Sequence, residues 1–565
     1  MIEVSDRELI ERVERFFADR GLETISVTVR AFPNETIVIV EMESIFAEEA
    51  IKVTSEVESE LPPGFLVVIR KADARVSVKK ASVTSVNDNR VSRLIELLNE
   101  RSRTSEQQPS LQYIVDAAQN LRVALTKRHH LIFGRRGVGK TALLLEAKRQ
   151  IEKSGAMHLW INVQVLRGLG AQRAFLTIAQ RLCELPAIVH RGRIPSPESV
   201  ARAKALDSTV STLLTKSTIP SGQVAAIVPA VQQLVGLLCA ERANDLFLFV
   251  DELHYLEARE QPLFLDFLHG VTRDNAAWLK IAGIRNQCRV YYDNSPTGLQ
   301  LGHDAAEIPL DVTLEEPRKA RKFLISVLQT YLNAAGIANR AVFLSSGAVD
   351  RLVLASGGVP RDFLVLSARS VQIARLRDNA RVVGVQDVNE AAGEAGKQKK
   401  AELEEDAEAS SGQAATHLRA LEVLREFTID QNHCSFFRVN LRDKNNRPDE
   451  YALLQSLMDL RMVHLVKGSL SEAHAAGERS EVYMIDLSEY SSSRLKKNLN
   501  VIELRGDMLV SRTTGQDGRT IVADTARKVV QIFRTGPLLD LGMLTPLLPS
   551  MPKKLAQGQA SFAFQ

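Results

Sequence analysis

The chain is poor in cysteine and has little excess of either charge. Its 565 residues include only four cysteines, which stand far apart without the spacing of metal ligands. We therefore expect reduced, buried thiols, and neither a disulfide framework nor a cysteine-based metal site. The net charge of +4 is too small to indicate nucleic-acid binding by itself. The cysteines are Cys183, Cys239, Cys288 and Cys434.

Signals for export or membrane insertion are also absent from the pattern. The first residues lack the basic and then apolar segment of a signal peptide, and we expect no apolar run long enough to span a bilayer. These observations predict a cytoplasmic protein without membrane contact. The apolar and charged fractions, 45% and 25%, are ordinary for globular proteins. The length predicts about three or four domains.

What the chain does contain is a phosphate-binding motif within residues 130–147. Gly134 is followed by four residues and then by Gly139-Lys140-Thr141, between a short apolar run and a helical pattern. In this strand–loop–helix setting, backbone N–H groups surround an anion at a helix N-terminus, where the helix dipole adds to the attraction. We expect Lys140 to reach the β- and γ-phosphates of ATP and the Thr141 hydroxyl to bind Mg²⁺. The flanking elements argue against a chance glycine-rich turn. The expected nucleotide-contacting residues are Gly134, Arg135, Arg136, Gly137, Val138, Gly139, Lys140, Thr141 and Ala142.

The second half of the expected site follows a short apolar run at residues 245–250. This run is rich in β-formers and is followed at once by Asp251 and Glu252. A buried parallel strand has this pattern, and its carboxyl end delivers acidic groups to the crevice of an α/β sheet. We expect Asp251 to hold Mg²⁺ and Glu252 to polarise the attacking water as general base. An acidic helix cap is the alternative, but the phosphate-binding motif favours ATP binding and hydrolysis.

Composition and periodicity divide the chain into an α/β protein of several domains. A small α/β domain is expected at 1–82 and a polar linker at 83–109. The nucleotide-binding core is expected at 110–310, where helices between strands predict a parallel sheet with crossover helices. A helix at 111–125 would lead into the first strand and could flank the adenine. The role of the segment at 186–222, rich in proline, serine and threonine, stays open.

The second half of the chain has a more helical pattern. The expected segments are a helical lid at 311–396, a charged linker at 397–415, a further domain at 416–490 and a C-terminal extension at 491–565. The charged linker favours a solvated hinge, although it could continue the preceding helix. The extension holds apolar residues between prolines, which predicts packing on a partner or on the body of the protein. Its last residues have the composition of a disordered end.

A glycine-rich junction in the lid supplies one more candidate site residue. Gly357 and Gly358 would end one lid helix, and Pro360 would begin the next. This arrangement holds Arg361 at a helix start, from which it could contact a nucleotide phosphate. A surface position is the alternative for a lone arginine.

This series of motifs resembles the AAA+ ATPases and is most similar to the origin-recognition-complex-like initiator group, over roughly residues 110–490. The resemblance implies a P-loop core with a lid and a winged-helix domain, in a homo-oligomer joined through the ATP interface. It implies a first sensor of the γ-phosphate at Asn286 or Arg285, with Arg361 as the second sensor. It also implies an arginine finger supplied to a neighbouring subunit, for which Arg273 and Arg289 are the candidates.

Residues 416–490 show the order helix, helix, strand, wing, strand that is typical of a winged helix. The expected recognition helix at 449–460 begins with Asp449-Glu450 and offers only Gln455 and Ser456 as readers of DNA. Basic and acidic residues balance at twelve each over residues 416–497, which predicts weak nonspecific DNA binding. DNA and protein therefore both stay open as partners of this domain. The basic residues just before the helix are Arg438, Arg442, Lys444 and Arg447.

The leading hypothesis is an ATP-driven molecular switch that assembles on DNA, in replication initiation, transposition or genome defence. The alternative is a scaffold or signalling ATPase whose winged helix, and whose residues 1–82, bind proteins. A motor that threads a polymer is less well supported, because no aromatic–hydrophobic pore loop follows the phosphate-loop helix.

Overall fold

The computed structural model describes residues 6–31, 36–62, 64–71, 83, 85–101, 104–105, 111, 113–114, 118–187, 196–292, 294–409, 413–471, 478–492, 494–514, 520–522 and 525–548. The N-terminal part is a small α/β unit with its own apolar core. Its sheet has the order β1-β2-β3, in which β1 and β2 are antiparallel and β2 and β3 are parallel. The elements are α1 (Asp6–Asp19), β1 (Thr24–Ala31), β2 (Thr36–Met42), α2 (Ser44–Lys52), α3 (Thr54–Glu60) and β3 (Phe65–Lys71).

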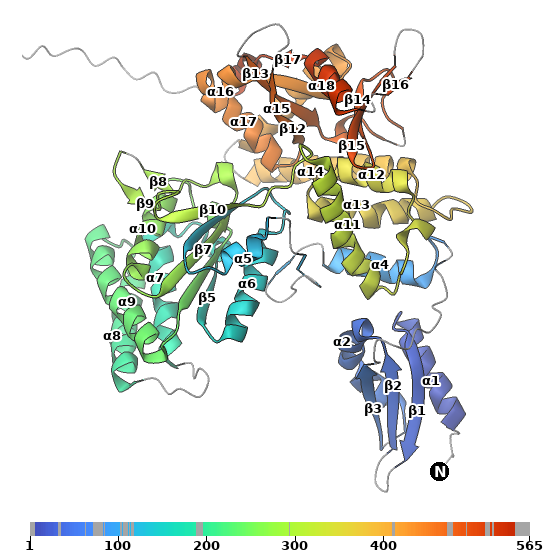
Figure 1. Cartoon of the computed structure of the whole chain (residues 1–565). Helices are drawn as coiled ribbons and strands as arrows, with labels where there is room; N and C mark the ends of the chain where they lie inside the picture. The colour runs from blue at the N-terminus through green and yellow to red at the C-terminus, as the bar shows by residue number, and fades with distance from the viewer. Residues whose placement is uncertain are drawn as a thin grey trace, which may run out of the picture.

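A five-stranded parallel sheet forms the core of the next part, in the order β10-β4-β7-β6-β5 (Figure 1). The inner strand β6 (Leu246–Asp251), between β7 and β5, is buried on both faces. Leu246, Leu248 and Val250 face a cluster with α7 to α10, while Phe247 and Phe249 face the cluster of α5 and α6. The apolar run therefore forms a doubly covered parallel strand, as predicted. The other elements are α5 (Asn120–Ala124), β4 (His129–Phe133), α6 (Lys140–Ser154), β5 (Met157–Asn162), α7 (Gly170–Glu184), α8 (Pro197–Leu214), α9 (Ser221–Arg242), α10 (Gln261–Thr272), β7 (Ala277–Gly283), a hairpin of β8 (Tyr291–Tyr292) and β9 (Thr297–Gly298), and β10 (Ala305–Pro309).

Two features of this part differ from the sequence-based expectations. Only α5 (Asn120–Ala124) forms where a helix at 111–125 is expected, and part of that range lies outside the described residues. Gly222–Arg242 of α9 is long and apolar enough to cross a membrane by length and composition, although no such run is expected. This helix contributes residues to the apolar core and packs against α7, α8 and α10.

The lid is a helical unit that includes a helix from before the five-stranded sheet. It contains α11 (Pro317–Ala334), α12 (Ser346–Ala355), α13 (Pro360–Arg375) and α14 (Val385–Ala409), joined by α4 (Asn89–Glu100). The segment at 83–109, expected as a polar linker, thus contains a helix whose apolar face is buried against α13. The expected hinge at 397–415 also differs, because α14 continues to Ala409. Lys399 and Lys400 in this part of α14 approach Asp486 and Glu489, at 3.9 and 2.6 Å, which ties the helix to the following domain.

The winged helix follows, with the two predicted helices and the two predicted strands. A strand at Phe436–Asn440 and a short helix at Leu441–Asn446, which were not predicted, lie between the two helices. Its elements are α15 (Gln413–Arg425), β11 (Phe436–Asn440), α16 (Leu441–Asn446), α17 (Pro448–Asp459), β12 (Val463–Ser471) and β13 (Arg479–Ile485). The C-terminal extension adds β14 (Val501–Arg505), β15 (Met508–Thr514), β16 (Thr520–Val522), α18 (Ala526–Thr535), β17 (Leu538–Leu539) and the 3-10 helix η8 (Leu541–Leu547). Strand β17 pairs with β11, and η8 packs on α15 and α17, so the proline-flanked segment packs on the body of the protein. The final residues, expected to be disordered, lie outside the described residues.

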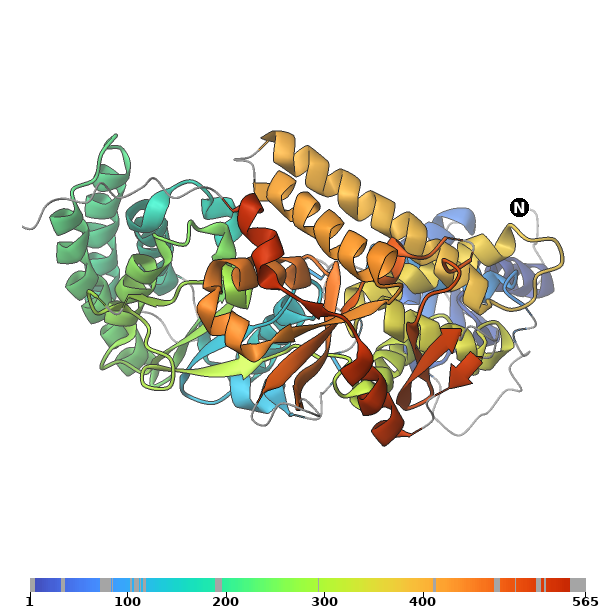
Figure 2. The same cartoon turned by 90° about the horizontal axis from the view of Figure 1, so that it is seen from above.

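The winged helix lies across the top of both the core and the lid in Figure 1, and the view from above in Figure 2 shows it between them. Its contact with the lid includes an ion pair between Arg461 and Asp362 of α13. Its contact with the core involves α17 and η4, a short 3-10 helix (Arg285–Gln287) after β7. All four cysteines are free; three are buried, as expected, but Cys288 is partly exposed.

Candidate nucleotide-binding site

The phosphate-binding motif forms a loop between β4 and α6. Gly137 and Gly139 have φ values of +84° and +104°, which L side chains rarely adopt, so the loop requires glycine at both positions. Lys140 begins α6, and its Nζ donates to the carbonyl oxygens of Gly134 and Arg135 at 2.8 and 3.1 Å. Burial lowers the pKa of Lys140, while Glu252 and Asp251 act in the opposite direction. A buried ammonium group needs anionic partners, and a phosphate supplies them.

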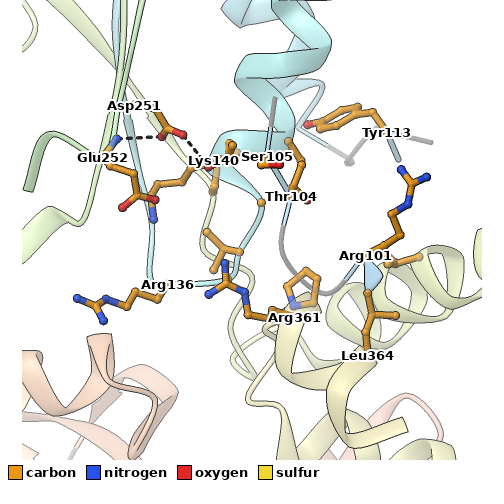
Figure 3. A pocket seen from close by; sticks show the side chains of 18 of the residues that line it. Arg101, Thr104, Ser105, Tyr113, Arg136, Lys140, Asp251, Glu252, Arg361 and Leu364 are labelled. Atoms are coloured by element: carbon orange, nitrogen blue, oxygen red, sulfur yellow. Dashed lines mark hydrogen bonds between the residues drawn. The ribbon is translucent and has the colours of Figure 1, made fainter. Parts of the chain in front are cut away.

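The acidic end of β6 meets the start of α6 across this loop. The Thr141 Oγ1 donates to Oδ2 of Asp251 at 2.8 Å (Figure 3). Burial raises the pKa of Asp251 to about 6, with a contribution from Glu252, because two carboxylates lie side by side. A hard divalent cation would offset this concentration of negative charge, and hydroxyl and carboxylate oxygens are ligands that Mg²⁺ prefers. The two side chains therefore fit the Mg²⁺ site that the sequence predicts.

Glu252 occupies an unusual backbone conformation at the end of β6. Its φ of +63° lies in the left-handed region, which costs a non-glycine residue about 1–3 kcal/mol and is found most often at functional sites. Its backbone N–H donates to Oδ1 of Asp251 at 2.9 Å. The conformation turns the chain sharply after Asp251, and the Glu252 side chain lines the cavity described next.

A cavity of about 790 Å³ opens between the core and the lid. It is bounded on one side by the phosphate loop from Arg136 to Ala142 with Asp251 and Glu252, and on the other by Arg361 (Figure 3). Tyr113, Phe323 and Tyr331 line it as well, together with Arg101, Thr104 and Ser105. A volume of this size is within the range of small-molecule sites, and the aromatic side chains suit an adenine ring.

Sequence reasoning missed most of the wall away from the phosphate loop. Tyr113 lies in the segment expected to flank the adenine, although it is not in a helix. Phe323 and Tyr331 come from α11, and Arg101 follows α4. The amphipathic pattern of α11 gave no sign of which face would meet the core, since that depends on how the lid closes on the sheet.

Two of the expected nucleotide-contacting residues do not line the cavity. Arg135 is only 3% exposed and turns away from it. Its Nε donates to Asp311 at 3.0 Å, and its terminal nitrogen donates to the carbonyl oxygens of Val312 and Gly357. Arg135 therefore fastens the phosphate loop to the base of the lid. Gly134 likewise lies behind the loop, where its carbonyl oxygen accepts from Lys140.

Arg361 is the predicted sensor that does reach the site. Its backbone N–H donates to the Gly137 carbonyl oxygen at 3.3 Å, so the start of α13 touches the phosphate loop directly. A Cβ atom at Gly137 would lie 2.9 Å from the Cβ of Arg361 and 3.0 Å from Val359. The glycine is thus needed for the close approach of lid and loop as well as for its backbone angle.

The other candidates lie away from the cavity. Asn286 donates to Oε1 of Gln455 and Oδ2 of Asp459 at 3.4 and 3.3 Å, so it contacts the winged helix. Arg285 pairs with Glu307 and stacks on Phe133. The two candidate arginine fingers are exposed: Arg273 caps α10, and Arg289 lies over the ring of Tyr292 at 4.2 Å.

We expect the Gly137→Ala variant to lose ATP affinity by about 10-fold or more, because overpacking at a contact costs about 1–3 kcal/mol and would displace Arg361. Isothermal titration with ATP measures the affinity. Gly302→Ala is the matched control, because Gly302 has the same φ of +84° but no atom within 4 Å of its added Cβ. Both variants should lose stability through backbone strain, and equal ATP affinities would contradict the role of the loop–lid contact.

No protein-family model matches this chain, and no curated protein matches it. Among solved structures it is similar to the Orc1 protein of Aeropyrum pernix in complex with DNA, at 16% identity over 70% of this chain and 93% of that one, with a TM-score of 0.34. It is also similar to two variants of the RuvB protein of Thermotoga maritima, at 14% identity over 60% of this chain and 79% of theirs, with TM-scores of 0.28 and 0.26. The parallel sheet with its phosphate loop and acidic strand end, the helical lid and the winged helix give this chain the predicted fold class, an α/β phosphate-loop core with a lid and a C-terminal winged helix.

Proposed function

We propose that this protein binds and hydrolyses ATP and uses the nucleotide to control the position of its winged helix. The observation that supports ATP binding and hydrolysis is the 2.8 Å hydrogen bond between Thr141 and Asp251, beside the buried Lys140. It places a hydroxyl, a carboxylate and an ammonium group at the mouth of one phosphate loop. These are the groups that ATP with Mg²⁺ requires, and they come from two elements far apart in the sequence.

Each residue of the site has a separate role in the proposed hydrolysis. Mg²⁺, when bound, neutralises developing charge on the phosphates, and Thr141 and Asp251 would hold it. Lys140 binds the phosphate oxygens, Arg361 approaches them from the lid, and Glu252 accepts the proton of the attacking water. The aromatic wall formed by Tyr113, Phe323 and Tyr331 holds the base and keeps water from that end of the cavity.

The proposal of a switch rests on the contact between η4 and the winged helix. Asn286, the expected first sensor, is hydrogen-bonded to Gln455 and Asp459 of α17. Gln455 in turn donates to Tyr483, and Tyr483 and Tyr451 both donate to Glu481. A continuous hydrogen-bond chain thus joins the sensor to the interior of the winged helix. We propose that bound ATP draws Asn286 toward its γ-phosphate and repels the Asp459 carboxylate, which releases α17.

The docked position also covers the expected recognition helix. Of α17, only Pro448, Asp449 and Ala452 are exposed, while η8 packs on its other side. The nearby cations are engaged within the chain: Arg442 with Glu478 at 2.9 Å and Lys444 with Glu481 at 3.6 Å. Arg438 donates to the Gly536 carbonyl oxygen at 2.9 Å, and Arg447 lies 3.9 Å from Asp540. In this state α17 offers DNA neither free charge nor an open face.

We propose that ATP exposes α17 for a partner, with assembly on DNA as the leading role. The paired cations favour the second candidate, a scaffold whose winged helix binds protein. A mobility-shift titration with and without ATP separates the two roles. DNA binding that requires ATP and weakens steeply with salt supports the first role, and no binding even at low salt supports the second.

Because Arg273 and Arg289 are exposed, either one is available as an arginine finger for a second copy of the chain across the ATP interface. A sizing run with and without ATP tests whether such an oligomer forms.

The docking of α17 on the core, which buries Asp459, should weaken with rising pH. Burial raises the pKa of Asp459 to about 7, with Asp311 adding to the rise and Asn286, Arg135 and Lys140 opposing it. An exposed aspartate has a pKa of about 3.9, so the docked state binds the proton more tightly than the released state. Docking is therefore strongest at low pH, weakens as the pH rises from about 4 to about 7, and changes little above that value.

Energy transfer between fluorophores at K204C on α8 and D449C on α17 measures docking. We expect the transfer in the otherwise unchanged chain to change between pH 4 and pH 7, and to change further when ATP is added at pH 7. The Asp459→Asn variant keeps an amide at this position but does not titrate. It should show no pH dependence in this range and a weaker response to ATP. A pH response equal in both proteins, or no response to ATP in either, would contradict the switch.

A further inference from the structure

The residue two places after Glu252 has no part in the chemistry described so far. His254 lies in η3, a 3-10 turn (Leu253–Tyr255) directly after β6. Its side chain is 3% exposed, and its Nε2 lies 3.1 Å from Oε2 of Glu252. Neither ring nitrogen forms a hydrogen bond with the described part of the chain. The ring of Tyr255, which lines the cavity, lies against the imidazole with centroids 4.8 Å apart.

The buried imidazole of His254 can act as a hydrogen-bond donor to the Glu252 carboxylate. Burial, and then the nearby Lys140 and Arg136, lower the pKa of His254 to about 3, so the ring is neutral at physiological pH. A neutral imidazole carries one N–H group, and an ionised carboxylate can only accept. A buried polar group without a partner is costly, and Glu252 is the acceptor within reach. The 3.1 Å separation of Nε2 and Oε2 puts the two groups within hydrogen-bond reach of each other.

Glu252 itself needs such a restraint. Its backbone is fixed in the left-handed region, but no hydrogen bond among the described residues holds its carboxylate. A general base must be held in a narrow range of orientations toward the proton it accepts, and a free glutamate side chain samples many rotamers.

We propose that His254 is a positioning residue for the general base: its Nε2–H group holds the Glu252 carboxylate toward the attacking water. The inference rests on the proposed ATPase function and assigns to that reaction a residue outside the phosphate loop, the acidic pair and the lid. His254 does not line the nucleotide cavity, so its proposed effect on the reaction passes through Glu252.

The test compares His254→Leu, which removes the donor, with His254→Gln, which keeps an N–H donor. In His254→Leu we expect kcat to fall by about 10-fold or more, while KM and the affinity for ATP stay within about 2-fold, because general-base contributions depend on orientation. His254→Gln should recover most of kcat. The melting temperature of His254→Leu should change little, since leucine fills the buried position and the released Glu252 carboxylate lines the open cavity. The control is the same pair of substitutions at His303, whose side chain is 82% exposed.

A double-mutant cycle separates positioning from a general structural effect. In a Glu252→Gln background the His254→Leu change should cause no further loss of kcat, because the carboxylate it positions is gone. An equal loss in both backgrounds, unchanged kcat in His254→Leu, or failure of His254→Gln to improve on it would overturn the inference. A wild-type protein that binds but does not hydrolyse ATP would instead overturn the proposed function.

A second readout does not depend on turnover. Nitrogen-15 NMR of histidine-labelled protein, with His254→Leu to assign the signal, reports which ring nitrogen carries the proton. We expect a neutral ring protonated at Nε2 at pH 7. A ring protonated at Nδ1, or a doubly protonated ring, would contradict the hydrogen bond to Glu252 even in a protein whose ATPase activity is normal.

Discussion

Replacement of Lys140 by alanine is expected to abolish ATP binding at micromolar nucleotide. Lys140 is the buried cation of the phosphate loop, 5% exposed, and its Nζ lies within hydrogen-bond distance of two loop carbonyl oxygens. Hydrogen bonds to charged groups contribute about 1.5–3 kcal/mol each, so losing more than one to the phosphates should weaken ATP binding by about 10²-fold or more. Isothermal titration of ATP with Mg²⁺ measures this directly.

The free protein should keep its stability in this variant. Burial lowers the pKa of Lys140, which means that the charged group is costly in the absence of phosphate, and alanine removes that cost. Lys204→Ala on the exposed side of α8 is the control for the loss of a lysine. Unchanged affinity in Lys140→Ala, or a loss of equal size in Lys204→Ala, would place the nucleotide elsewhere.

The Glu252→Gln variant should bind ATP as the wild type does but hydrolyse it about 10²-fold or more slowly, the loss typical of a missing general base. Glutamine keeps the size and polarity of the side chain and cannot accept the proton. Its backbone conformation should also be retained, since the φ of +63° is set by the turn after β6. Phosphate release under saturating ATP gives kcat, and a fluorescent ATP analogue gives the affinity.

Glu257→Gln provides the matched control for this change. Glu257 lies five residues farther along, is 60% exposed on its side chain and pairs with Arg259 at 2.8 Å. Its amide variant should turn over ATP at the wild-type rate. Wild-type turnover in Glu252→Gln would show that another group accepts the proton. A fall in affinity with no fall in kcat would show that Glu252 binds nucleotide without serving as the base.

Local patterns were enough to predict the elements that carry the chemistry. The Gly134–Thr141 motif and the apolar run before Asp251 each specify one strand end, and parallel strands bring such ends to the same edge of a sheet. Although β11 and α16 were missed, two helices and two strands of the winged helix could also be predicted from clear periodicities. These features depend on neighbours in sequence, which is the information that periodicity contains.

Features set by packing between distant segments could not be predicted. The polar residues on either side of α4 made the segment at 83–109 resemble a linker. The apolar face of α4 is buried because it packs on the lid helices. The charged segment at 397–400 favoured a solvated hinge, yet it continues α14, and its Lys399 and Lys400 approach acids of the winged helix. The position of Asn286 depends on how α17 docks on the core, and no property of residues 284–287 reveals that contact.

A crystal structure with Mg²⁺ and a non-hydrolysable ATP analogue tests the central claim most directly. The account predicts a triphosphate within the loop from Arg136 to Ala142, Mg²⁺ bound by Thr141 and held by Asp251, and Arg361 directed at the phosphates. A nucleotide bound outside the cavity between core and lid, or a magnesium ion that neither Thr141 nor Asp251 approaches, would contradict it.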